Sequence, residues 1–193
     1  MRMSRRHLLR SAGAVCACCA APNALLASDP RGEQAPHWSY DGATGPAHWG
    51  ELQPDFKVCQ LGLEQTPVDL KGGIKADIGA LDVDYRPLPL RIQNNGHTIQ
   101  VNADAGAHVT LGSVRYELTQ FHFHHPSEHL LSGTAFPMEL HLVHRAPSGA
   151  LAVIGVFLSI GAHNRALAPV FDALPAQQGP EVRTGATVDI AAL

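Results

Sequence analysis

The sequence predicts a mainly β fold of the α+β class with a few short helices, and three observations indicate it. Short apolar runs of strand length follow one another between about residues 88 and 160, with turn-forming residues between them. The dipeptide Asn95-Gly96 between two of these runs is typical of a tight β-hairpin. Helical spacing of apolar residues occurs only late in the chain, at 167–174. Strands joined by turns, followed by one helix, are therefore expected.

The predicted elements begin with an irregular segment. Residues 37–73 are rich in Gly, Pro and Trp, which predicts irregular structure with short turns. Strands are predicted at 88–93, 98–101, 108–111, 114–124, 138–144 and 151–160. The late helix is predicted from the apolar residues Leu167, Val170, Phe171 and Leu174. Pro169 must then lie in the first turn of that helix, where a missing N–H costs little.

Composition limits the classes of function that fit this chain. With 45% hydrophobic and 16% charged residues among 193, it is typical of a globular protein rather than a disordered one. The formal net charge is −3 and no basic patch occurs, so nucleic acid is not an expected partner. No apolar run reaches the roughly 18 residues of a membrane-spanning helix. We therefore expect neither nucleic-acid binding nor a membrane span in the mature protein.

The first residues are typical of an export signal. Arg5 and Arg6 precede a short apolar stretch at 11–22, which indicates a signal peptide of the twin-arginine type, with cleavage near Ala27. A membrane anchor is the alternative, but the apolar stretch is too short for one. The mature protein is therefore expected in the periplasm or outside the cell. The predicted organisation is a signal at 1–27, a linker at 28–36 and one domain at 37–193.

Three of the four cysteines lie in the predicted signal. Cys16, Cys18 and Cys19 form at best a poor lipoprotein box, which is a weaker alternative for the same segment. The mature chain keeps only Cys59. A single cysteine in an exported protein indicates a free thiol or an absent partner.

Histidines cluster in two of the predicted strands. Side chains alternate along a strand, so Gln120, His122 and His124 share one face, while Phe121 and Phe123 face the other side. Two histidines at i and i+2 on a rigid strand can both reach one metal ion. The residue types and spacing therefore predict half of a metal site.

The strand at 138–144 repeats this arrangement. Glu139, His141 and Val143 share one face, while Leu140, Leu142 and His144 share the other. If the two strands pair antiparallel, His141 approaches His122 and His124. Three neutral imidazoles with a fourth position open are the ligand set of a catalytic zinc ion. Gln120 and Glu139, each two residues before a ligand and on its face, are expected to accept hydrogen bonds from the ligand rings.

Two other interpretations of these histidines remain open at this stage. They can be unrelated core or surface residues, as single histidines usually are. The pattern His122-x-His124-x₃-Glu128 also resembles the first metal motif of a cupin, in which the glutamate is itself a ligand. The glycines that bracket the cupin motif are not at the usual spacing, and no second cupin motif follows.

Ordered motifs along the chain resemble the α-class carbonic anhydrases. They are Trp38-Ser39-Tyr40, Gly45-Pro46-Ala47-His48-Trp49, Gln65-Thr66-Pro67-Val68-Asp69-Leu70, Asn94-Asn95-Gly96-His97, Gln120-Phe121-His122-Phe123-His124, Pro126-Ser127-Glu128-His129, Glu139-Leu140-His141-Leu142-Val143-His144 and Leu151-Ala152-Val153-Ile154-Gly155-Val156-Phe157-Leu158. The resemblance implies a central mixed, mostly antiparallel twisted sheet with a few short peripheral helices. It also implies reversible hydration of CO₂ to bicarbonate through a zinc-bound hydroxide.

The same resemblance implies a role for each matching residue. Zn²⁺ is expected on His122, His124 and His141, with Gln120 and Glu139 orienting these ligands. Glu128 is expected in the hydrogen-bond network that positions the hydroxide. His97 is expected to carry the proton away, although a histidine after an Asn-Gly turn needs no function. Val143 and Val153 are expected to line an apolar CO₂ pocket, whereas His125 and His144 lie off the ligand face and are expected to be structural.

The match to this family stops at Leu193. In the family, several tens of residues follow this point, with a segment of the Ser-Leu-Thr-Thr-Pro-Pro type, further strands and the usual partner of the cysteine matched by Cys59. The sequence therefore predicts a carbonic anhydrase-like domain that is incomplete at its C-terminus. The alternative function is an inactive, zinc-binding remnant of the family.

Overall fold

The computed structural model describes residues 38–77 and 79–193, which belong to two compact units divided between Thr66 and Pro67. The predicted signal and linker, and the first residue of the predicted domain, lie outside the described residues. No helix in the described part of the chain has the length and apolar character needed to cross a membrane.

The first unit, as far as it is described, consists of short helical turns. They are η1 (Gly42–Thr44), η2 (Pro46–His48), α2 (Trp49–Leu52), η3 (Pro54–Lys57) and α3 (Val58–Leu61). Trp38, Tyr40 and Trp49 pack edge to face, with ring centroids 5.3–5.8 Å apart. The indole N–H of Trp49 donates to two backbone carbonyls and so ties the turns together. Short turns of this kind are what the Gly- and Pro-rich composition predicted.

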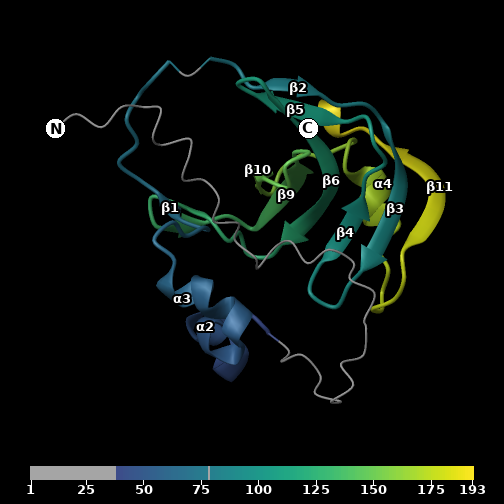
Figure 1. Ribbon diagram of the computed structural model, residues 1–193. Coiled ribbons are helices and arrows are strands. Elements are labelled where there is room, and N and C mark those ends of the chain that lie inside the picture. The colour runs from purple at the N-terminus through teal and green to yellow at the C-terminus, as the bar shows by residue number, and fades with distance from the viewer. Residues whose placement is uncertain (1–37, 78) are drawn as a thin grey trace. The chain divides into compact units, whose positions relative to one another are not determined.

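The second unit is built on a large sheet with strand order β10-β9-β6-β4-β3-β11, in which β5 also pairs with β6, and β2 with β5 (Figure 1). Its strands are β2 (Asp82–Asp84), β3 (Leu88–Asn94), β4 (Ile99–Asn102), β5 (His108–Leu111), β6 (Val114–His124), β9 (Met138–Arg145), β10 (Leu151–Leu158) and β11 (Val182–Val188). Every pairing in this sheet is antiparallel. A small second sheet of β1 (Asp69–Leu70), β7 (Leu130–Leu131) and β8 (Thr134–Ala135) contains one parallel pair. The predicted mostly antiparallel sheet is confirmed.

Six strands agree with their predicted positions to within two residues, and five others were not predicted. The strands β1, β2, β7 and β8 have only two or three residues, which is too short for an alternation pattern to show. The strand β11 is exposed except for Val188, so no apolar face marks it. It also contains Gly185 at φ +82° and a register shift between Arg183 and Thr187. Nothing in the local sequence of β11 predicts its pairing with β3.

The apolar core covers one face of the large sheet. Phe121, Leu140 and Val101 are fully buried there on β6, β9 and β4. The helix α4 (Ala168–Asp172) lies beside β3 and β11 and adds Val170 to this core (Figure 1). Pro169 lies in the first turn of α4, as predicted. Because side chains alternate, this core leaves the opposite face of β6 and β9 for polar side chains.

Candidate metal centre

Strands β6 and β9 bring together the histidines that the sequence separates by 17 to 19 positions. They pair antiparallel, with His122 opposite His141 and Phe121 opposite Leu142. A register shift between Leu118 and Gln120 adjusts the pairing just before the histidines. The alternation predicted from sequence therefore extends across both strands, with Phe121 and Leu142 on the core face and His122 and His141 on the other.

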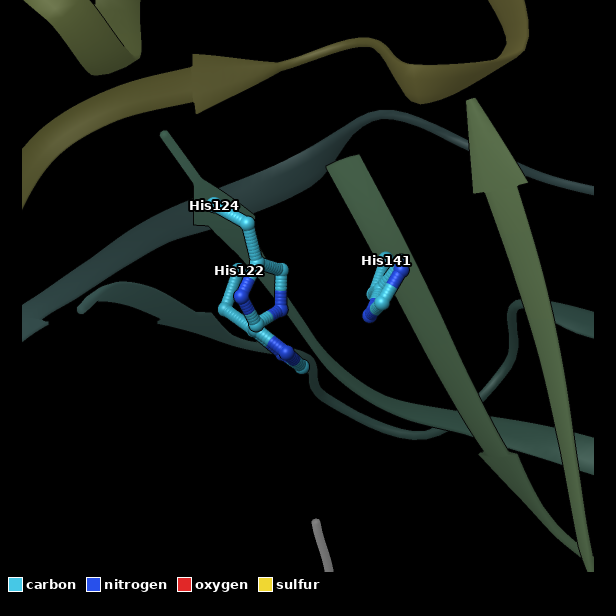
Figure 2. Close-up of side chains that lie close together, drawn as sticks. All are labelled: His122, His124 and His141. Carbon is cyan, nitrogen blue, oxygen red and sulfur yellow. The ribbon is translucent and has the colours of Figure 1, made fainter. Parts of the chain in front are cut away.

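Three imidazole rings converge on this second face. The ring centroids lie 4.8 Å apart for His122 and His124, 4.5 Å for His124 and His141, and 5.4 Å for His122 and His141. One nitrogen of each ring lies within 4.8 Å of the others. Figure 2 shows that two of these side chains extend from β6 and the third from β9. This arrangement can hold one metal ion.

Gln120 fixes the ring orientation of His122. Its amide oxygen lies 2.8 Å from Nδ1 of His122. Because an amide oxygen only accepts, Nδ1 carries the proton and Nε2 keeps a lone pair for a metal ion. A polar residue at position 120 therefore has a function that an apolar strand residue could not supply.

Glu139 does the same for His141 from a deeply buried position. Its side chain is only 2% exposed, and Oε1 lies 3.0 Å from Nε2 of His141, which leaves Nδ1 for a metal ion. Burial by itself would raise the pKa of Glu139, but hydrogen bonds from the His129 backbone and from His141 lower the pKa below its ordinary value. Glu139 is therefore held as a carboxylate.

Two neighbours of Glu139 were missed by the sequence analysis. His129 donates its backbone N–H to Oε2 at 2.9 Å, and its Nδ1 lies 2.8 Å from Oε1. Gly155 lies opposite His141 on β10, and a Cβ at that position would come within 2.8 Å of Oε1. The missing side chain therefore leaves room for the carboxylate. The only sequence signal for His129 was its place directly after Glu128.

Glu128 lies against the histidine cluster. Its Oε1 is 3.3 Å from Nδ1 of His124, and its Oε2 is 3.8 Å from Nδ1 of His141. Burial lowers the pKa of His124, and the negative charge of Glu128 opposes that shift. The structure thus places Glu128 next to two of the predicted ligands, where it contributes negative charge.

The remaining predicted site residues surround this centre at different depths. Val143 is buried on β9, two residues after His141, and pairs across the strands with Val153. Val153 is about half exposed, at 49%. His97 is exposed in the turn between β3 and β4, where its backbone N–H donates to Oδ1 of Asn95 at 3.0 Å. Val143 and Val153 form an apolar pair beside the histidines, and His97 faces solvent at the sheet end.

His125 and His144, which were expected to be structural, contact groups outside the histidine cluster. Nδ1 of His125 lies 2.7 Å from the carbonyl oxygen of Pro137. His144 is fully buried, and its Nε2 lies 2.8 Å from the hydroxyl of Tyr85. Burial lowers the pKa of His144 and raises the pKa of Tyr85 to about 12. Both groups of this pair are therefore uncharged at neutral pH.

The donor set fits a zinc ion. Neutral imidazoles are common ligands of zinc, and a set of three leaves one position open. A second group of potential ligands, His129, Glu139 and His141, overlaps the first. Its members already contact one another, so the group of His122, His124 and His141 fits a metal better. Neither group includes Glu128, which the cupin interpretation requires.

Burial lowers the pKa of both His122 and His124, which keeps these two rings uncharged and able to bind a metal ion. Burial, followed by the nearby His124 and His141, lowers the pKa of His122 from 6.5 to about 3. In the unfolded chain, His122 takes up a proton below about pH 6.5. Between pH 6.5 and pH 3 the unfolded state thus binds more protons, and stability must decrease as the pH falls.

We therefore expect His122 to make the metal-free protein pH-sensitive. Its contribution lowers the free energy of unfolding at pH 5 by about 2 kcal/mol relative to pH 7.5. Urea unfolding of the chelator-treated protein at both pH values measures the change. The variant His122→Gln provides the control, since it should lose this part of the pH dependence. An equal pH dependence in both proteins would contradict the assignment.

A mainly antiparallel sheet with three imidazoles converging on one face has the arrangement of a three-histidine metal site. The family model described as eukaryotic-type carbonic anhydrase matches residues 44–193, and the chain belongs to that family. This membership sets the cupin interpretation aside.

Relatives with curated names agree with the family. The carbonic anhydrase of Nostoc sp. (strain PCC 7120) is 45% identical over 161 residues, which cover 81% of this chain and 61% of the Nostoc protein. The carbonic anhydrase of Pectobacterium atrosepticum is 41% identical over 150 residues, which cover 77% of this chain and 62% of that protein. The chain thus spans about three fifths of the length of these relatives.

Solved structures share the fold. The α-carbonic anhydrase of Thermovibrio ammonificans, in complex with the inhibitor sulfanilamide, has a TM-score of 0.78 and 36% identity, covering 83% of this chain and 72% of that one. Dioscorin complexed with ascorbate has a TM-score of 0.74 and 30% identity, covering 81% of this chain and 69% of that one. The second example shows that the fold also occurs in a protein solved with a different kind of ligand.

Proposed function

We propose that this protein catalyses the reversible hydration of CO₂ to bicarbonate and a proton, with Zn²⁺ held by His122, His124 and His141. The observation that carries the proposal is the convergence of three imidazole nitrogens within 4.8 Å on one sheet face. Contacts of Gln120 and Glu139 with the other ring nitrogens support it, because they turn the free nitrogens of His122 and His141 toward a common ion. Membership of the carbonic anhydrase family supports the reaction.

The protein's own residues prepare the site for this reaction. A zinc ion on three neutral imidazoles supplies a Lewis-acid centre at which water becomes acidic near neutral pH. Gln120 and Glu139 keep the ligand rings in place, so that no reorganisation is needed during turnover. Val143 and Val153 offer an apolar surface for CO₂, which has no charge to pair. The carboxylate of Glu128 is placed to accept a hydrogen bond beside His124.

The hydration releases a proton, which must leave the site. We assign this step to His97, because an imidazole can accept and release a proton near neutral pH. Its position in an exposed turn supports the assignment, since the side chain can pass the proton to buffer in solution.

The proposal is tested with the full chain, purified and loaded with zinc. We expect about one zinc per chain and CO₂ hydration that sulfanilamide inhibits. The chelator-treated protein is the control and should lose the activity, which added zinc restores. The alternative, a zinc-binding domain of the family without hydration activity, predicts bound zinc but no sulfanilamide-sensitive hydration. Either that result or the failure to bind zinc would refute the proposed reaction.

A further inference from the structure

A row of polar side chains runs along the sheet from Glu181, directly before β11, to the turn that carries His97. Asn102 donates its Nδ2 to Oε2 of Glu181 at 2.6 Å. Gln100 donates its Nε2 to Oδ1 of Asn102, also at 2.6 Å. Asn95 donates its Nδ2 to Oε1 of Gln100 at 3.4 Å. These residues connect a carboxylate that precedes β11 with the hairpin between β3 and β4.

The row has one direction, and Glu181 sets it. The hydrogen bond from Arg91 lowers the pKa of Glu181, so its side chain is a carboxylate and can only accept. Asn102 must therefore turn its NH₂ group toward Glu181 and its oxygen toward Gln100. The same reasoning turns the NH₂ group of Gln100 toward Asn102, and that of Asn95 toward Gln100. The far end of the row then presents the amide oxygen of Asn95 to the turn.

That oxygen holds the backbone of the turn. Oδ1 of Asn95 accepts hydrogen bonds from the backbone N–H groups of His97 at 3.0 Å and Thr98 at 2.9 Å. If the amide were reversed, its NH₂ group would face two N–H donors, which is unfavourable. The conformation of the His97 backbone therefore depends on the orientation of an amide that Glu181 fixes from a distance.

The segment before β11 holds the same turn by a second route. Gln178 donates its Nε2 to the carbonyl oxygen of Asn95 at 3.3 Å, and the N–H of Gly179 donates to the carbonyl oxygen of Asn94 at 3.0 Å. Glu181 itself is held by Arg91, whose Nε donates to Oε1 at 2.8 Å. The segment 178–181 and the turn thus form one connected polar unit.

This unit lies next to the strand that carries the metal ligands. Gln100 on β4 is the cross-strand partner of His122, and Asn102 is the partner of Gln120. Gln100 and Asn102 therefore lie next to the strand that carries two of the candidate ligands. The role that fits this position is to hold groups in place, because neither Glu181 nor Asn102 is among the candidate metal ligands.

We propose that Glu181 is a positioning residue that acts through Asn102, Gln100 and Asn95 to hold the turn of His97 in the conformation used for proton transfer. This inference rests on the proposed function for its kinetic consequence. The structural part, a coupling between Glu181 and the turn, stands apart from any activity. The two parts can therefore be tested separately.

The variant Glu181→Gln tests the structural part. Glutamine keeps the size of the side chain but has only one oxygen. Arg91 is a donor and must bond to that oxygen, so Asn102 loses its acceptor. We expect the His97 and Thr98 backbone amides to exchange hydrogen with solvent about fivefold faster, the factor that one net hydrogen bond corresponds to. Exchange measured residue by residue by NMR on the zinc-free protein gives this result without reference to catalysis.

Asp104→Asn is the matched control. Asp104 also accepts a hydrogen bond from Arg91 but makes no hydrogen bond to Asn102 in the described part of the chain. This variant should leave exchange at His97 and Thr98 unchanged, while Asn102→Ala should reproduce the effect of Glu181→Gln. Unchanged exchange in Glu181→Gln, or equal acceleration in Asp104→Asn, would overturn the proposal.

The kinetic part is measured on the zinc-loaded chain. Proton release follows the conversion of CO₂, so Glu181→Gln should lower kcat about three- to tenfold at low buffer concentration and leave kcat/KM nearly unchanged. Imidazole in solution should restore kcat, because a diffusible base can carry out the proton transfer that the variant slows. A parallel fall in kcat and kcat/KM without rescue would overturn the kinetic role. If the wild-type chain lacks hydration activity, the proposed function fails, and the exchange measurement still decides the coupling.

Discussion

Replacing His141 with alanine is expected to abolish zinc binding and CO₂ hydration together. His141 is the one ligand supplied by β9, and its loss leaves two imidazoles on β6. Two neutral ligands hold zinc far more weakly than three. Loss of only a ligand's hydrogen-bond partner lowers metal affinity by up to about 100-fold, so loss of the ligand itself should lower it by more than that. The hydration rate should fall at least about a thousandfold, because the acidified water is lost with the ion.

Zinc content and hydration rate, measured on the same preparation, check this result. The variant His125→Ala is the matched control, since His125 directly follows β6 but bonds to the carbonyl oxygen of Pro137. It should keep its zinc and its activity. Full zinc occupancy in His141→Ala would show that the ion lies elsewhere and would remove the basis of the proposed site.

The second large effect is expected for Glu139→Gln. The carboxylate of Glu139 is shared by Nε2 of His141 and by both the ring and the backbone of His129. Glutamine has one oxygen and one NH₂ group, so one of these donors loses its acceptor in a buried place. The orientation of His141 is then no longer fixed, and zinc affinity should decrease 10- to 100-fold, as is typical for such partners.

A competition titration with a zinc chelator measures the affinity of the wild type and the variant. The control is Glu117→Gln, because Glu117 lies on the neighbouring strand β6 but pairs with Arg115 at the surface. The control should bind zinc as the wild type does. If Glu139→Gln binds zinc equally well, the buried carboxylate does not orient the ligand, and its contacts serve only the stability of the fold.

Part of the site could be predicted from the sequence. Alternation along a strand is a local property with a period of two residues, so the faces of His122, His124 and Glu139 followed from the sequence. The core followed in the same way, because Phe121 and Leu140 occupy the alternate positions. A polar residue two positions before a strand histidine, on the same face, was itself a signal for an oriented ligand.

Other members of the site had no local signal. His129 reaches Glu139 only because the segment after β6 folds back against β9. Gly155 is recognisable as space for the carboxylate only once β10 is paired with β9. Glu181 contacts Asn102 across 79 positions of sequence. No pattern within either segment predicts such a contact.

The sequence by itself thus predicted six of the described strands, their two faces, the candidate ligands and the resemblance to a family, since these depend on neighbouring residues and on motif order. The tertiary structure decided which strands pair, and in which register. It therefore decided that His141 lies opposite His122, that a glycine makes room for Glu139, and that the distant carboxylate of Glu181 accepts a hydrogen bond from Asn102. The physical reason is that register between strands is set by the packing of the whole sheet, and a shift of one residue would turn the candidate ligands of the shifted strand toward the core.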